Sequence, residues 1–125
     1  MLNRMLAAVA VLAFVAVPLA AQADAGAKGG TEMELTGKVI DVNCHTTGVS
    51  GSDHKQCAQA CAKAGVSLAI LGQDGNIYIP VSSKPGDPQN SRLLEFAEAR
   101  VTVKGVHRFA NGLHTIEIKS VAPAS

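Results

Sequence analysis

Residues 100–121, RVTVKGVHRFANGLHTIEIKSV, decide the fold of this chain. Apolar and polar residues alternate on both sides of Asn111-Gly112, and this combination predicts a β-hairpin with a tight turn. A second hairpin is predicted upstream, because residues 66–71 and 76–81 are short apolar runs joined through an Asp-Gly turn sequence. Two hairpins in so short a chain indicate a mainly β domain.

The rest of the chain adds one strand and two helices. Residues 33–43 predict a first strand, whose alternation slips after Val39 and so suggests a bend or bulge near Gly37. Cys44 continues the later parity, and we expect it at the strand end, pointing inward. Two helices are predicted, over residues 54–64 with a capping box from Asp53 to Gln56, and over residues 91–99.

This order of elements predicts a small five-stranded barrel of the oligonucleotide-binding (OB-like) type. Such a barrel has a helix between its third and fourth strands, and the first helix is then an insertion in an enlarged first loop that carries the Cys/His cluster. Gly37 and Gly105 suit the sharp strand bends that a barrel needs. A small sandwich is the alternative architecture.

The N-terminus has the pattern of a secretory signal peptide. Arg4 precedes an apolar run that ends in small-x-small sequences, which predicts a signal over residues 1–23 with cleavage after Ala23 or Ala25. A flexible spacer over residues 24–32 and one domain over residues 33–122 follow. We therefore expect a periplasmic or secreted protein that has no membrane span after cleavage.

Composition narrows the class of function. The formal net charge is +1, Trp is absent and aromatic residues make up 3% of the chain, so nothing indicates nucleic-acid binding. No phosphate-binding loop, serine-hydrolase elbow or zinc-protease helix motif is present. The sequence predicts a monomeric, non-catalytic domain whose partner is a metal ion or a periplasmic protein.

Three cysteines and a histidine carry most of the chemistry. His54, Cys57 and Cys61 recur at the spacing of one helix face, and Cys44 lies at the end of the predicted first strand. Thiolate and imidazole are ligands for soft or borderline cations. We expect these four residues to bind a metal ion, with Cu(I) as the first candidate and Zn(II) as the second. His45 is a further candidate ligand.

Two alternatives use the same thiols without a metal. Exported proteins usually pair their cysteines, so a disulfide from Cys44 to Cys57 or Cys61 would staple the loop helix to the first strand. The domain would then be an interaction module, and the staple would contribute ~3 kcal/mol. A redox-active thiol is the third possibility, because His54 lies near Cys57 as a base.

Three segments carry a family resemblance. They are GKVIDVNC (residues 37–44), the His54-Lys-Gln-Cys57-Ala-Gln-Ala-Cys61 helix and the Gly75-Asn-Ile-Tyr-Ile79 strand. Together they resemble a group of small exported bacterial barrel proteins with a Cys/His-bearing loop helix. The resemblance implies the barrel fold and export, and it implies no active-site residue.

The remaining polar residues are expected to be structural. His107 and His114 are interpreted as strand histidines whose ring nitrogens are hydrogen-bonded or partly exposed to solvent. Five charged residues are expected to lie on solvated faces: Glu95, Glu98, Lys104, Glu117 and Lys119.

Overall fold

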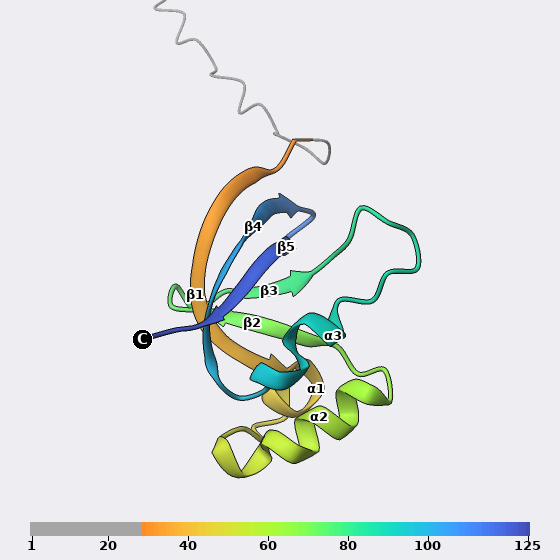
Figure 1. Ribbon diagram of the computed structural model, residues 1–125, viewed down its shortest axis with the longest axis vertical. Helices are drawn as coiled ribbons and strands as arrows, with labels where there is room; N and C mark the ends of the chain where they lie inside the picture. Colours follow the sequence, from red (N-terminus) through yellow and green to blue (C-terminus); the bar gives the residue numbers. More distant parts are fainter. Residues whose placement is uncertain (1–28) are drawn as a thin grey trace, which may run out of the picture.

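The computed structural model describes residues 29–125, so the predicted signal peptide lies outside the described residues. The prediction of a mainly β barrel with two helical insertions is confirmed (Figure 1). In chain order the elements are β1 (Thr31–Asp41), α1 (Val42–Thr46), η1 (Ser52–His54), α2 (Lys55–Lys63), β2 (Leu68–Gly72), β3 (Ile77–Pro80), α3 (Asn90–Leu93), η2 (Leu94–Phe96), β4 (Arg100–Ala110) and β5 (Leu113–Pro123).

Five strands close into a barrel in the order β1-β2-β3-β5-β4, in which β4 returns to β1. All neighbouring strands are antiparallel except β3 and β5, which pair in parallel between Tyr78 and Pro80. The helices α1 and α2 lie together at one end of the barrel, and the connection from β4 to β5 lies toward the other (Figure 1).

The first strand bends because it belongs to two pairings at once. Residues 31–38 pair with β4, and residues 37–41 pair with β2. A side chain at Gly37 would collide with the carbonyl oxygen of Leu71, which explains the glycine at the crossing point. β1 keeps its register through Gly37, so the predicted bulge is not there. In the described strands the register shift lies at Lys104/Gly105 instead.

Aliphatic side chains fill the barrel, with Tyr78 as the buried aromatic residue among those described. The fully buried members include Val39, Ile70, Val101 and Ile116. Past Val39, both Ile40 and Asp41 are buried, although neighbours on a strand point to opposite faces. The end of β1 contacts α2, so it is covered on both sides, and this explains the slip in the apolar pattern.

Several boundaries differ from the prediction. β1 ends at Asp41 and a short helix follows, so Cys44 lies on α1 and not at a strand end. The loop helix begins at Lys55 after a 3-10 turn, and no side-chain capping bond from Asp53 is formed. The helix predicted over residues 91–99 is two short pieces, α3 and η2, with Leu93 fully buried.

Candidate metal centre

Asp41 is the last residue of β1 and the first polar group of the site. Its side chain is 1% exposed. One carboxylate oxygen, Oδ1, accepts the backbone N–H of Cys44 at 2.9 Å and so caps the N-terminus of α1. The other oxygen, Oδ2, is buried and has no hydrogen-bond partner. A buried carboxylate oxygen without a hydrogen bond lowers the stability of the fold, so a bound ligand that contacts this atom would be stabilising.

Two thiols lie beside this carboxylate. A carboxylate oxygen of Asp41 and the sulfurs of Cys44 and Cys61 all lie within 4.8 Å of one another. Over residues 29–125 this is the one group of three or more potential ligands that meets this spacing. The turn of α1 brings Cys44 back toward Asp41, and α2 presents Cys61. Two buried alanines on α2, Ala58 and Ala62, let this helix lie close to the barrel.

The environment of both thiols disfavours their ionised form. Burial, followed by the charges of Cys57, Asp41 and Cys44, raises the pKa of Cys61 to about 11. Burial, followed by the charge of Asp41 and the neighbouring Cys57, raises the pKa of Cys44. Both sulfurs therefore hold their protons near neutral pH unless a positive charge is placed between them.

Cys57 is the most accessible of the three thiols. It lies one helical turn before Cys61 and is exposed, whereas Cys44 and Cys61 are half-buried. All three are free thiols in this structure, so neither predicted staple is formed in it. The sulfur of Cys57 influences the pKa values of the other two cysteines but lies outside the compact triad with Asp41.

His54 is buried in η1 and is held by a carboxylate. Its Nδ1 lies 3.1 Å from Glu98 Oε1 and must carry the hydrogen of this bond, because an ionised carboxylate only accepts. In the neutral ring the other nitrogen, Nε2, is then an acceptor. It is buried and has no partner. His45 has a similar orphaned atom, Nδ1, on α1.

Glu98 contradicts the expectation of a solvated charge. Its side chain is 1% exposed, and it receives Lys38 Nζ at 2.5 Å and the backbone N–H of Gly51 at 2.9 Å as well as His54. Burial opposes the charge, yet hydrogen bonds from Lys38, Gly51 and His54 together lower the pKa of Glu98. The residue also has a positive φ of 62°, which is uncommon outside glycine. It ties the cysteine-bearing loop to the start of β4.

The structure thus divides the four predicted ligands. Cys44 and Cys61 meet at one point, with Asp41 as the third member that the sequence interpretation missed. The signal for Asp41 is its position three residues before Cys44, at the end of an apolar run, where an aspartate caps the next helix. Cys57, on α2, and His54, in η1, lie outside this triad.

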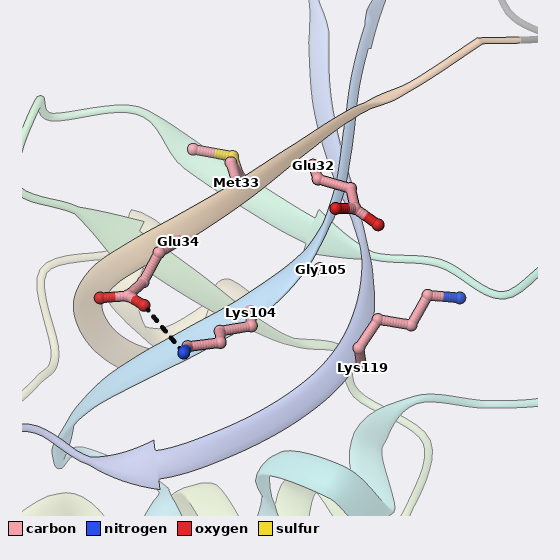
Figure 2. A pocket seen from close by; sticks show the side chains of 6 residues that line it. All are labelled: Glu32, Met33, Glu34, Lys104, Gly105 and Lys119. Carbon is pink, nitrogen blue, oxygen red and sulfur yellow. Dashed lines mark ion pairs between the residues drawn. The ribbon is translucent and has the colours of Figure 1, made fainter.

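A hollow on the outside of the barrel is lined mainly by exposed charged side chains and is a weaker candidate for a functional site. It lies over β1, β4 and β5 where Gly105 lacks a side chain, and Figure 2 shows Glu34 turned toward Lys104 across it. Their ion pair spans 3.3 Å, with side chains 59% and 67% exposed, so solvent screens it. The Asp41 triad remains the better candidate for a functional site.

Within residues 29–125, the helices are all too short or too polar to cross a membrane. Comparisons of the chain with protein-family models, with curated proteins and with solved structures return no match.

Proposed function

We propose that this protein is an exported, non-catalytic barrel domain that binds a thiolate-preferring metal ion, Zn(II) or Cu(I), at the Asp41–Cys44–Cys61 cluster. The observation that carries the proposal is the buried, half-satisfied carboxylate of Asp41 beside two free thiols. A monomer in the periplasm or outside the cell is the expected form, in keeping with the signal-like N-terminus.

A cation resolves the electrostatic conflict in this cluster. Without one, the charge of the Asp41 carboxylate adds to burial in raising the pKa values of Cys44 and Cys61, and Asp41 Oδ2 has no partner. A bound metal ion makes the thiolate the stable form and gives the orphaned oxygen a ligand bond. The same residues that disfavour an empty ionised site therefore favour an occupied one.

The donor set favours Zn(II) over Cu(I). Zn(II) accepts sulfur and carboxylate oxygen together, at ~2.3 Å and ~2.0–2.2 Å, and prefers four ligands in a tetrahedron. Around one tetrahedral ion these bond lengths place the donor atoms about 3.5–3.8 Å apart, so donor atoms already within 4.8 Å of one another need only a modest contraction. Cu(I) prefers sulfur alone, so it would use Cys57 as the third ligand and leave Asp41 aside.

His54 is the proposed fourth ligand for zinc, and binding requires it to move toward the triad, because its ring nitrogens lie outside the group of donor atoms within 4.8 Å of one another. A metal-bound histidine usually donates its other ring N–H to a carboxylate, which fixes the tautomer and the ring orientation. His54 already makes this bond to Glu98, and its Nε2 is the buried atom without a partner. The hydrogen bond from His54 to Glu98 therefore supports the proposal, because it holds the ring as it is held in histidines that bind a metal ion through Nε2.

Competition titrations against a chromophoric chelator test the proposal. With reduced mature protein, the Cys44→Ser, Cys61→Ser double variant should lose at least about 100-fold in Zn(II) affinity, because both sulfur ligands are removed. Cys57→Ser is the matched control, with little effect on Zn(II) and a clear loss for Cu(I). Unchanged affinities for both ions in the double variant would overturn the proposal.

Asp41→Asn separates the two ions. The amide keeps an oxygen to cap α1 but removes the charge that zinc uses, so Zn(II) affinity should fall about tenfold or more. Cu(I) affinity should be unchanged, because a soft ion binds the sulfurs. A larger loss for Cu(I) than for Zn(II) would assign Asp41 to another role.

A disulfide-stapled interaction module is the second candidate. The observation that favours it is the proximity of the Cys44 and Cys61 sulfurs, because these two can be joined after a small movement. Counting thiols in denatured protein taken directly from its native compartment separates the candidates. One free thiol without metal supports the staple, and three free thiols with bound metal support the metal centre.

A further inference from the structure

His107 and His114, which the sequence predicts to be unrelated strand histidines, lie side by side on neighbouring strands. His107 lies on β4 opposite Ile116, and His114 lies on β5 opposite Phe109, so the two are diagonal neighbours across the pair of strands. His107 Nε2 and His114 Nδ1 are 3.0 Å apart. Both side chains are partly exposed, so solvent and ions reach them.

Aromatic neighbours hold both imidazole rings in place. The two rings are stacked, with centroids 5.2 Å apart and planes 17° apart. Tyr78 on β3 packs against both, at 5.4 Å from His107 and 5.1 Å from His114. Phe109 covers another side of His114 at 4.6 Å. The rings are thus oriented by their surroundings and not only by their mutual hydrogen bond.

We propose that His107 and His114 form a second metal site, a two-imidazole chelate for a borderline divalent cation such as Zn(II) or Cu(II). Two imidazole nitrogens at ~2.0–2.1 Å from one ion are separated by about 2.9 Å at the right angle of a square-planar Cu(II) site and by about 3.3 Å at the tetrahedral angle of a Zn(II) site. The observed separation of 3.0 Å matches the first value and is within about 0.3 Å of the second. Imidazole is a ligand that both Zn(II) and Cu(II) favour.

Binding requires a change of tautomer and no net loss of protons. In the neutral pair, one of the two facing nitrogens carries the hydrogen and the other accepts it. In the chelate both facing nitrogens donate lone pairs to the ion, so that hydrogen moves to the far nitrogen of the same ring. Each ring must also tilt, so that its lone pair points at the ion and not at the partner ring.

The surroundings favour a cation and leave it open to solvent. Asp74 accepts the Tyr78 hydroxyl at 2.7 Å and places a carboxylate behind the aromatic ring that packs on both histidines. The nearest arginine in sequence, Arg108, is engaged by Glu117 at 3.2 Å. Two protein ligands leave the other coordination positions to water or to a donor from another molecule, which suits reversible binding of an exchangeable ion.

The histidine pair is independent of the cysteine cluster. His107 pairs with Thr31 at the start of β1, whereas Asp41 is the last residue of this strand. The two sites therefore lie at opposite ends of β1, and one can be tested while the other is disabled.

Imidazole ¹⁵N NMR of the intact reduced protein during a Zn(II) titration tests the site. The signals of His107 Nε2 and His114 Nδ1 should shift together to values of metal-bound nitrogen. In the Cys44→Ser, Cys61→Ser variant the same shift should occur with the first equivalent of Zn(II), whatever the fate of the cysteine site. An imidazole pair that keeps its bridging hydrogen in excess Zn(II) would overturn the proposal.

Single substitutions provide the second readout. His107→Asn and His114→Asn should each weaken this binding event at least tenfold, because one ligand cannot chelate. His45→Asn, on α1, is the matched control and should leave it unchanged. Spectra of each variant without metal show whether the barrel is retained, and His114→Gln replaces any variant that unfolds. Full binding in both folded single variants would overturn the proposal.

Discussion

Cys61 shows how a single residue makes metal binding depend on pH. With a pKa of about 11, its thiol is protonated in the empty site at neutral pH, and Cys44 is shifted in the same direction. Each sulfur that binds a metal ion must first lose its proton. Zn(II) affinity should therefore rise by about tenfold per pH unit for each thiol proton displaced.

Isothermal titrations in buffers of different ionisation enthalpy, between pH 6 and pH 8, measure this proton release directly. Cys57→Ser serves as the control and should keep the pH dependence of the parent for Zn(II). An affinity that does not change with pH would mean that the thiols are not the ligands.

Glu98 makes a second prediction at the residue scale. Its carboxylate holds Lys38, Gly51 and His54 from a buried position. Glu98→Gln keeps the size of the side chain but removes the charge, so Lys38 loses its partner. We expect the free energy of unfolding to fall by about 2–3 kcal/mol, since Lys38 is partly exposed and can recover some solvation. Glu95→Gln, at an exposed position, is the control.

Urea unfolding followed by circular dichroism measures the difference. A loss no larger than that of the control would show that the buried ion pair contributes nothing to stability. The sequence context of Glu98 predicts a solvated face, and this prediction is wrong because the burial of Glu98 depends on Lys38 and Gly51, which lie far away along the chain. Local pattern carries no information about such partners.

At the scale of elements, β1 joins two parts of the barrel, because it pairs with β2 on one edge and with β4 on the other. Gly37 lies where this strand belongs to both pairings, against the backbone of β2. In Gly37→Ala the new methyl group would meet the Leu71 carbonyl and lie 2.7 Å from Ile70 Cγ2, which forces the two strands apart. We expect a loss of about 1–3 kcal/mol in the free energy of unfolding.

The matched control is Gly29→Ala. A side chain at Gly29 meets no atom within 4 Å, so this variant should unfold at the same denaturant concentration as the parent. Equal stability of the two variants would mean that β1 and β2 can separate without cost, contrary to the close packing seen between them.

The elements that the sequence predicts well are those whose signal is local. Both hairpins are found because alternation and the Asp-Gly and Asn-Gly turns are written in adjacent residues. The turn residues Gly75, Asn111 and Gly112 have positive φ, as this turn chemistry requires. α1 is missed because five residues, VNCHT, contain no strong helix former, and the helix exists through the Asp41 cap. The metal triad depends on this turn, so only two of its three members are found.

At the scale of the whole molecule, acid should weaken the fold in a defined range. The Tyr78 hydroxyl and Asn76 lower the pKa of Asp74 by hydrogen bonding. Ser83 lowers the pKa of Glu117 by the same means, and, against the effect of burial, Arg108 lowers it further. Both carboxyl groups bind protons more readily in the unfolded chain. Their contribution to stability is complete above the unfolded pKa values, near 4, and is lost as the pH falls through the lower folded values.

Thermal unfolding of metal-free protein between pH 2 and pH 6 measures this loss. The Asp74→Asn, Glu117→Gln double variant should be less stable than the parent at pH 6 and should lose less on acidification. An equal acid loss in the parent and the double variant would assign the effect to other groups.

The closure of the barrel has a consequence for the order in which the chain folds. Residues 37–41 of β1 pair with β2, the next strand in the sequence, but the longer paired segment, residues 31–38, pairs with β4, so that Thr31 meets His107. β5 must also reach back to β3 in parallel. A chain made from its N-terminus thus carries an unfinished sheet edge until almost its last residue is available. Long loops must close before the contacts between distant strands can stabilise the fold, so we expect folding on the millisecond-to-second scale of barrel proteins. Until β4 has formed, the unpaired edge of β1 is exposed to other chains.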